Sequence, residues 1–420
     1  MAVPHRQQLL ERALALPAVG VLVDRLGSDF SPTVRLVGGA VRDLLAGTPP
    51  VDLDVMVEGP VAALAAALGG DKLRLHDRFA TATIELEGIR CDIAQARTET
   101  YPAPGALPDV GPGTAEADLR RRDFSVNAMA LTLTGPDQGE LRSVPDALSD
   151  LESGQLRVLH DLSFSDDPTR LLRLARYAAR LRFAVEPHTL ELVKRALAAN
   201  ALATVSGARI GNELRLLAAE PDPVAALAAL AALGVDRSID PRFGLDAASV
   251  LDAASVLERG LALLPAHYRR DRLALSVALL DVAAPAAMAL LDRLAFTAED
   301  RDAIVAAATQ ARSLSGRLEM ARQPSQIDAA AAGAEPELVA LAGALGPAAA
   351  AREWLQRLRE LRLDITGADL LAAGIPQGPA IGVGLAGARA ALLDGAAPDR
   401  SSQLAIAVTV ALEAGAGGRA

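Results

Sequence analysis

The chain has 420 residues, with 42 Lys and Arg against 52 Asp and Glu, and 51% of its residues are hydrophobic while only 3% are aromatic. This length allows several domains with sizeable cores, and the dominance of Ala and Leu favours helices over sheets. The single cysteine, Cys91, excludes an intrachain disulfide framework and a multi-cysteine zinc site, which favours the reducing cytoplasm. Apolar runs such as 223–234 are shorter than the roughly 20 residues of a membrane span, so we expect no membrane partner. The net charge of −10 argues mildly against nucleic-acid binding, although the field on one face matters more than the total.

The N-terminal residues predict helices and then a strand. Apolar spacing over 6–26 predicts two short helices, separated at Pro17 and Gly20. Residues 34–37 predict a strand that enters a tight turn at Gly38-Gly39.

A helix is predicted directly after that turn, over 40–45. Two glycines let backbone N–H groups approach a phosphate, and Arg42, one turn into the helix, adds positive charge there. An ordinary strand–helix turn has the same local pattern.

Two aspartates lie in the next predicted strand. Between residues 51 and 57 apolar residues alternate with Asp52, Asp54 and Met56, which predicts a half-buried strand with both carboxylates on one face. Two such carboxylates can bridge divalent metal ions, which activate the attacking oxygen and stabilise the leaving one in phosphoryl transfer.

Further strands are predicted at 81–86, 89–94 and 129–133, and Asp92 lies inside the second of them. The Pro- and Gly-rich segment 101–113 predicts a loop.

Two basic segments follow. In 118–130 three consecutive arginines stand next to an acid, a composition that suits triphosphate or RNA backbone. Residues 168–182 predict a helix whose arginines share one broad face, with no acid between 168 and 185, so that face is not neutralised by residues near it in the sequence. The acids at 166 and 167 have the position of helix caps, and a carboxylate beside a guanidinium can also bind the Watson–Crick edge of a base.

Strand signals nearly vanish after residue 150. We therefore predict an α+β chain with an α/β head over 1–150, a helical neck over 151–220 and a helical body and tail over 221–420.

Taken together in this order, the motifs resemble class II CCA-adding tRNA nucleotidyltransferases and bacterial poly(A) polymerases, within the polymerase-β-like nucleotidyltransferase superfamily. The resemblance implies a polymerase-β-like head with a small mixed sheet, followed by an all-α remainder that binds RNA. It rests on LVGGAVRDLLAG (36–47), VDLDVMVEG (51–59), CDIAQARTETYPAPGALPDV (91–110), DLRRRDFSVNAMAL (118–131), SFSDDPTRLLRLARYAARLRF (163–183), VSGARIGNEL (205–214) and ITGADLLAAGIPQGPAIG (365–382).

The resemblance implies a metal site. Asp52 and Asp54 match the two catalytic ligands of Mg²⁺, and Asp92 stands where a third carboxylate could lie near the metal. Gly39 and Arg42 resemble the contacts to the incoming triphosphate.

It also implies a site for the nucleotide. Arg121 and Arg122 match paired arginines, one or both of which reach the nucleotide. Asp167 and Arg170 resemble the pair that reads the base of CTP or ATP in place of a nucleic-acid template. The family's further nucleotide-binding positions on this helix match Arg173 and Arg176, and we expect Asn127 to be a structural hydrogen-bonding residue.

The chain departs from the family pattern in places. Asp166 and Ala208 stand where many members have Glu, and the tail after residue 382 is poor in groups that contact bases or phosphates.

The implied activity is addition of C, C and A to the 3′ end of tRNA from CTP and ATP. The 3′-hydroxyl attacks the α-phosphate and pyrophosphate leaves. CC-only addition, A-only addition and polyadenylation share the head motifs and stay open as alternatives. A catalytically inactive RNA-binding protein is disfavoured by the intact Asp52 and Asp54 pair.

Overall fold

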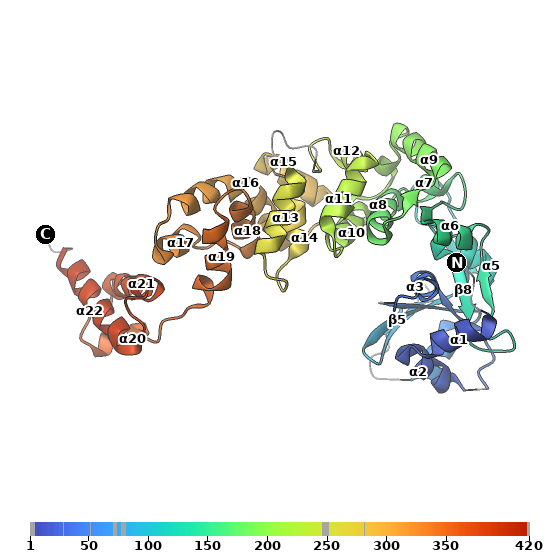
Figure 1. Cartoon of the computed structure of the whole chain (residues 1–420), viewed down its shortest axis with the longest axis horizontal. Helices are drawn as coiled ribbons and strands as arrows, with labels where there is room; N and C mark the ends of the chain where they lie inside the picture. The colour runs from blue at the N-terminus through green and yellow to red at the C-terminus, as the bar shows by residue number, and fades with distance from the viewer. Residues whose placement is uncertain are drawn as a thin grey trace. The chain divides into compact units, whose positions relative to one another are not determined.

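The computed structural model describes residues 5–27, 29–50, 52–69, 74–76, 81–245, 252–280 and 282–417. The chain folds into two compact units, residues 1–213 and 214–420 (Figure 1). The first unit therefore contains the predicted head and most of the predicted neck. No helix among the described residues is long and apolar enough to span a membrane.

The first unit is built on one mixed sheet, whose seven described strands lie in the order β3-β4-β5-β2-β1-β8-β9. Strands β2 and β5 pair in parallel and the other neighbours pair antiparallel. Two small two-stranded sheets, β6-β7 and β10-β11, lie outside it. The strands are β1 (Val34–Val37), β2 (Leu53–Val57), β3 (Arg74–His76), β4 (Thr81–Leu86), β5 (Ile89–Gln95), β6 (Arg97–Thr100), β7 (Asp109–Pro112), β8 (Met129–Thr132), β9 (Leu141–Ser143), β10 (Gln155–Leu156) and β11 (Ala184–Val185).

Helices precede, interrupt and follow this sheet. They are α1 (Arg6–Leu14), α2 (Pro17–Leu26), α3 (Gly39–Ala46), α4 (Val61–Leu68), α5 (Ala115–Arg120), α6 (Ala147–Ser153), α7 (Ser163–Asp166), α8 (Arg170–Leu181), α9 (Pro187–Ala198) and α10 (Gly207–Ala218), with 3-10 turns η2 (Ser125–Asn127) and η3 (Ala201–Thr204). The predicted break at Pro17 is confirmed. Helix α2 begins at this residue, where a proline is well tolerated. The predicted break at Gly20 is wrong, since α2 runs through it.

Strand β2 is more deeply buried than the alternation predicted. Its position between β1 and β5 buries Val55, Met56 and Val57 alike, and Met56 packs in a core cluster with residues of β1 and β8. Asp54 lies in the strand, whereas Asp52 lies just before it. The first residue of the predicted strand, Val51, lies outside the described residues.

The other predicted strands are confirmed, and the predicted loop is wrong in its last part. Glu87 and Gly88, both with positive φ, turn β4 into β5 as a tight hairpin requires. Within 101–113, residues Asp109–Pro112 form β7, which pairs antiparallel with β6. Local composition predicted a loop because strand pairing with β6 depends on a partner outside the segment.

The predicted arginine-bearing helix begins later than expected. Helix α8 starts at Arg170 because the Asp167 side chain accepts hydrogen bonds from the backbone and hydroxyl of Thr169 and holds a turn there. It ends at Leu181, because the next residue, Arg182, has a left-handed φ of 56°.

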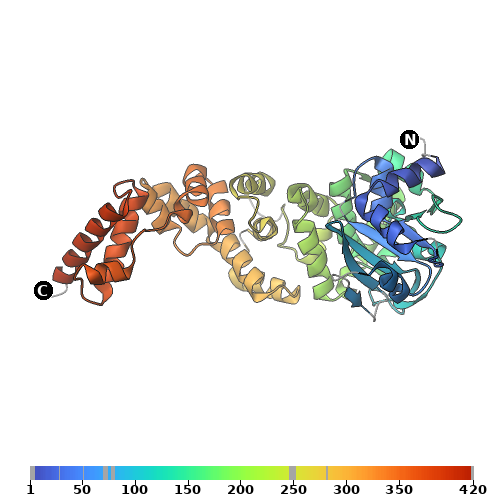
Figure 2. The same ribbon diagram turned by 90° about the horizontal axis from the view of Figure 1, so that it is seen from below.

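In the second unit, the regular elements among the described residues are all helices, joined by turns and loops (Figure 2). Every residue of α18 is buried, and it packs against α13, α14, α16 and α19. A separate small core, formed by α20, α21 and α22, contains Leu370, Ala388 and Ala407. The helices are α11 (Pro223–Ala232), α12 (Val235–Ile239), α13 (Ala253–Leu263), α14 (Arg270–Ala278), α15 (Ala284–Arg293), α16 (Ala298–Met320), α17 (Pro324–Ala330), α18 (Pro336–Ala344), α19 (Ala348–Gln356), α20 (Gly367–Ala372), α21 (Pro379–Leu393) and α22 (Arg400–Gly417), with the 3-10 turn η4 (Leu358–Glu360).

Candidate active site

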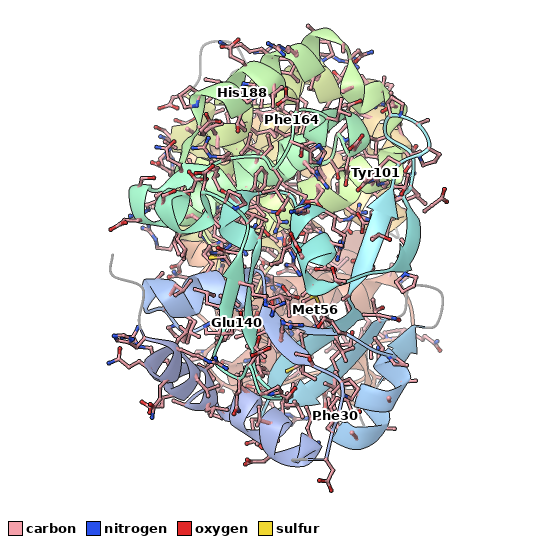
Figure 3. All side chains as sticks on the ribbon, turned by 90° about the vertical axis from the view of Figure 1, so that its right-hand side faces the viewer. Phe30, Met56, Tyr101, Glu140, Phe164 and His188 are labelled. Atoms are coloured by element: carbon pink, nitrogen blue, oxygen red, sulfur yellow. The ribbon has the colours of Figure 1, made fainter. Side chains whose placement is uncertain are left out.

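A polar cavity of about 600 Å³ lies in the first unit, between the sheet and helix α8. Strands β1, β2 and β5 supply one wall, and the segment after α5 and the start of α8 supply another. Tyr101, which follows β6, also lines it (Figure 3). Eight of the predicted site residues line the cavity: Gly39, Asp54, Asp92, Arg121, Arg122, Asp167, Arg170 and Arg173. Asp52, Arg42 and Arg176 do not.

The carboxylates lie on adjacent parallel strands. Asp54 of β2 is paired in register with Asp92 of β5, so both side chains stand on one face of the sheet. The Asp54 side chain is open to the cavity, yet the protein around it limits its hydration. This partial burial, and then the charges of Asp92 and Asp52, raise the pKa of Asp54, while Arg122 and Arg173 oppose the rise.

The free carboxylates fit a divalent metal. Neither Asp52 nor Asp54 has a hydrogen-bond or ion-pair partner among the described residues, so their oxygens stay available for a cation. Asp92 is less available, because it accepts from the Thr83 hydroxyl at 2.7 Å and pairs with Arg90. Among the described residues no group of three or more His, Cys, Asp or Glu is placed to hold a metal. One or two carboxylates completed by phosphate oxygens and water are nevertheless a usual Mg²⁺ environment.

The glycine turn brings the backbone close to this charge. Gly38 has a φ of +69°, and a Cβ there would lie 2.7 Å from Arg122 Nη1 and 3.3 Å from Asp54 Oδ2. Glycine at 38 therefore lets β1 end directly against the carboxylate and the guanidinium.

Arg42 lies behind the turn. It is buried, donates to Asn127 Oδ1 at 2.6 Å and pairs with Asp43. Asn127 donates in turn to Asp123 at 3.2 Å. These contacts agree with the structural role expected of Asn127, and they leave Arg42 outside the cavity that it was expected to reach.

The paired arginines after α5 share one buried acid. Arg121 and Arg122 bind different oxygens of Asp118, at 2.7 and 3.0 Å. Arg121 also binds Glu99 at 2.8 Å. Both guanidinium groups are thus fixed at the cavity wall with most of their charge balanced.

The base-reading pair predicted at the start of α8 is fixed in the same way. Arg170 donates to the Ser163 hydroxyl at 2.7 Å and to the carbonyl of Arg121 at 2.8 Å. Asp167 binds Arg209 of α10 at 2.8 Å.

No acid near α8 in the sequence neutralises its arginine face, as predicted, but acids from distant parts of the chain do. Arg173 binds Asp123 at 2.6 Å, and Glu213 of α10 lies 3.5 Å from Arg173 and 3.4 Å from Arg176. Burial opposes charge on Asp123, but the Arg173 guanidinium prevails and holds the pKa of Asp123 below its usual range. The neutralising acids are distant in sequence, so no local pattern revealed them.

An aromatic ring organises these arginines. The guanidinium groups of Arg42, Arg173 and Arg176 lie 5.8, 5.6 and 5.2 Å from the Tyr177 ring centroid, and Phe124 packs against the same ring edge-on. Sequence reasoning missed Tyr177, and also the buried or charged partners Asp118, Asp123, Arg209 and Glu213. Asp118 and Asp123 flank the three consecutive arginines, and this position was the signal that could have identified them.

Cys91 is fully buried in β5, and burial raises the pKa of its thiol to about 12. It is a core residue, as expected from the sequence.

Comparison with known proteins gives consistent matches. Residues 34–157 match the poly A polymerase head domain. A CC-adding tRNA nucleotidyltransferase of Deinococcus radiodurans is 38% identical over 367 residues, which are 86% of this chain and 84% of the relative. Two A-adding tRNA nucleotidyltransferases, from Geobacter sulfurreducens and Halalkalibacterium halodurans, are 39% and 45% identical over 56% and 48% of this chain. The chain spans only 27% and 48% of those two relatives.

Solved structures extend the likeness to nearly the whole chain. An unliganded CCA-adding enzyme superposes with a TM-score of 0.79 and 28% identity, covering 96% of this chain and 98% of the other. The CCA-adding enzyme of Thermotoga maritima, solved in complex with tRNA, has a TM-score of 0.73 and 27% identity over 97% of this chain and 99% of its own.

Proposed function

This chain belongs to the tRNA nucleotidyltransferase family, and from that premise we propose that it adds C, C and A to the 3′ end of tRNA without a nucleic-acid template. The observation that carries the proposal is the cavity in which Asp54 faces fixed arginines and the Asp167–Arg170 pair. The match to solved CCA-adding enzymes over nearly the whole chain supports it.

Nucleotidyltransferases of this family use a divalent metal. We propose Mg²⁺, held by Asp52 and Asp54, because free carboxylates near a phosphate site suit that ion. When bound, the metal would stabilise negative charge on the reacting phosphate and lower the pKa of the attacking hydroxyl.

The chain's own residues bind and orient the triphosphate. The Gly38-Gly39 turn brings the phosphates close to the backbone. Because the Gly38 N–H donates to the Met129 carbonyl oxygen, the N–H groups at the start of α3 are the ones that remain for the phosphates. Arg121 and Arg122 face the cavity with guanidinium groups held by Asp118, so little entropy is lost when they bind phosphate oxygens. Arg173 adds charge from α8, whereas Arg42 and Arg176 support the site from behind it.

Asp167 and Arg170 select the base by a pattern that C and A share. Both bases present an amino donor beside a ring-nitrogen acceptor on the Watson–Crick edge. A carboxylate that accepts and a guanidinium that donates match this pair. U and G present a carbonyl and a ring N–H at those places, so the same pair of side chains disfavours them.

The reaction forms one bond and breaks another at the α-phosphorus. The tRNA 3′-hydroxyl gives its proton to solvent water, and its oxygen attacks the α-phosphate of CTP or ATP. The bond to the β-phosphate oxygen breaks, and pyrophosphate leaves with the charge. Fixed arginines stabilise that charge without reorganising during the step.

We propose that the second unit binds tRNA by shape and backbone contact. The complex of the Thermotoga maritima relative with tRNA supports this partner. A tRNA substrate and the absence of disulfide chemistry in a chain with one cysteine support a cytoplasmic location.

The direct test uses purified protein, Mg²⁺ and labelled CTP or ATP on three tRNA substrates, ending at the discriminator base, after one C, and after CC. Addition of C, C and A to the first substrate supports the proposal. Asp52→Ala should abolish addition while leaving tRNA binding in place.

Partial addition is the second candidate, because the Deinococcus relative matched over most of its length is a CC-adding enzyme and two others are A-adding. Addition that stops at CC, or that requires CC already present, would establish it. Long A-tails on unrelated RNA would establish polyadenylation. If no nucleotide were incorporated into any RNA, the proposed nucleotidyltransferase activity would be refuted.

A further inference from the structure

The base-reading aspartate is held from behind by an arginine of α10. Arg209 Nη2 donates to Asp167 Oδ1 at 2.8 Å, and Arg209 Nη1 donates to the carbonyl oxygen of Gly105 at 3.0 Å. Arg209 lies outside the set of residues that line the cavity, so it does not face the nucleotide itself. The planar guanidinium fork makes both bonds at once, which an ammonium group cannot do with the same geometry.

The hydrogen bonds on Asp167 are unequal between its two oxygens. Oδ1 accepts from Thr169 N at 3.0 Å, from Thr169 Oγ1 at 2.6 Å and from Arg209. A carboxylate oxygen offers about two lone-pair sites, so three donors fill Oδ1. Oδ2 has no hydrogen-bond partner among the described residues. It is therefore the acceptor left for a base in the cavity.

The loop that Arg209 holds can dock only through glycine. Gly105 has a φ of +70°, and its N–H donates to Ser165 O at 3.0 Å. A Cβ at this position would lie 2.1 Å from the hydroxyl and 2.8 Å from the carbonyl oxygen of Thr204. The loop 101–108 is thus seated against α7 and η3, and Tyr101 at its start lines the cavity.

We propose that Arg209 is a positioning residue for base selection. By joining Gly105 to Asp167, it fixes the carboxylate with Oδ2 toward the base. A carboxylate held in this orientation accepts a hydrogen bond from the amino group of C or A, and it repels the carbonyl oxygen of U or G. A carboxylate free to rotate loses part of that difference. The inference rests on the proposed function and specifies how its base selection is enforced.

The test replaces Arg209 and measures nucleotide preference. Arg209→Met removes both bonds, and Arg209→Lys keeps the charge but reaches one acceptor at a time. Arg195→Met, exposed on α9, is the matched control. CTP and UTP binding is titrated with Mg²⁺ and without tRNA, and single-nucleotide incorporation is then measured for both.

Arg209→Met should weaken CTP binding about tenfold, the order expected for a lost charge-assisted hydrogen bond, and UTP binding little. The preference for CTP over UTP then falls about tenfold, through KM more than kcat. Arg209→Lys should be intermediate, and the control should match the wild type.

A second variant tests the loop side of the same contact. Gly105→Ala should lift the loop and reduce the preference similarly, and the double variant should lose no more than either single variant, because both break one connection. An unchanged preference in Arg209→Met, even with a lower Tm, would overturn the inference. A wild-type protein that itself does not prefer CTP and ATP over UTP would instead overturn the proposed base selection and the inference with it.

Discussion

Single residues in the cavity hold negative charge at a cost in stability. The pKa of Asp54 is raised by burial and by two neighbouring carboxylates, so the folded state binds its proton more tightly than the unfolded chain does. Its effect on stability is therefore unfavourable once pH rises through the raised pKa and the carboxylate ionises. The same ionisation creates the metal-binding form. The affinity for Mg²⁺ should thus increase with pH through a pKa above the usual range for Asp, because the proton and the metal compete for the same carboxylate.

Asp54→Asn should separate these two effects. Without divalent metal at pH 7, its Tm should be equal to or above that of the wild type, because a poorly hydrated charge beside two other carboxylates is gone. Nucleotide addition should fall by about 10²–10³-fold or more. Mg²⁺ should raise the Tm of the wild type only. Asp24→Asn, exposed on α2, is the charge-matched control. A clear loss of Tm in metal-free Asp54→Asn would contradict this account.

Gly38 tests how closely the backbone must approach the phosphate site. Gly38→Ala should strain a positive φ and press on Arg122 and Asp54, so KM for the triphosphate should rise about tenfold. Gly47→Ala is the matched control, because Gly47 has a φ of +76° and a Cβ there would meet nothing within 4 Å. The Tm should decrease by a similar amount in both variants, while KM should change only in Gly38→Ala. Equal KM values would show that the close approach is unimportant.

At the scale of elements, the arginines of helix α8 are held in place by partners on other elements. Asp123 precedes η2 and Glu213 lies on α10, and both bind arginines of α8 across long stretches of chain. Tyr177, on α8 itself, contributes the aromatic face against which three guanidinium groups pack. The helix is therefore oriented by ion pairs and stacking in addition to its apolar side.

Removing Asp123 should show how much the ion pair with Arg173 contributes to the free energy of unfolding. Asp123→Ala leaves the Arg173 guanidinium without its nearest partner, and we expect a loss of about 3 kcal/mol in the free energy of unfolding at pH 7. Because the pKa of Asp123 is lowered in the folded state, its contribution is present above the ordinary Asp pKa and shrinks as pH falls below it.

Urea unfolding of both proteins at pH 7 and near pH 3.5 measures this, and the difference between them should be smaller at the lower pH. Asp137→Ala, at an exposed position, should cost almost nothing. A difference independent of pH would rule out the ion pair as its source.

At the scale of the whole molecule, chemistry and helical packing belong to different units. The cavity with its carboxylates and arginines is formed by residues of the first unit, up to Arg173 and Tyr177. The second unit is centred on the fully buried α18, whose small residues allow neighbouring helices to approach closely. We therefore expect damage to the second core to leave nucleotide binding intact.

Gly343→Ala tests that separation. A Cβ on Gly343 would lie 2.3 Å from the Ala351 Cβ and 2.9 Å from Leu263 Cδ1, so overpacking should cost about 1–3 kcal/mol. Calorimetry should show a lower transition for the second unit, with CTP affinity unchanged. Gly316→Ala, with open space at its Cβ in α16, should be neutral or stabilising. A weakened CTP affinity in Gly343→Ala would show that the units are coupled.

The amino-acid sequence by itself determined most of the elements in the sheet, the family and a core set of the residues that line the cavity. Periodicity located β1, β4, β5 and the arginine helix, because strand and helix spacing are local properties. Motif order identified candidates for the metal carboxylates, the triphosphate contacts and the base-reading pair, and eight of all these predicted positions line one cavity.

Only the tertiary structure decided which side chains face the cavity and which partners hold them. Arg42 and Arg176 belong to the motifs yet lie behind the cavity, because Asn127 and Glu213, far along the chain, bind them there. Residues 109–112 form a strand only because β6 lies beside them. The Arg209 contact with Asp167 and Gly105 joins three segments that local sequence does not connect. Ion pairs and strand pairings depend on distance in space, and spacing along the chain does not contain that information.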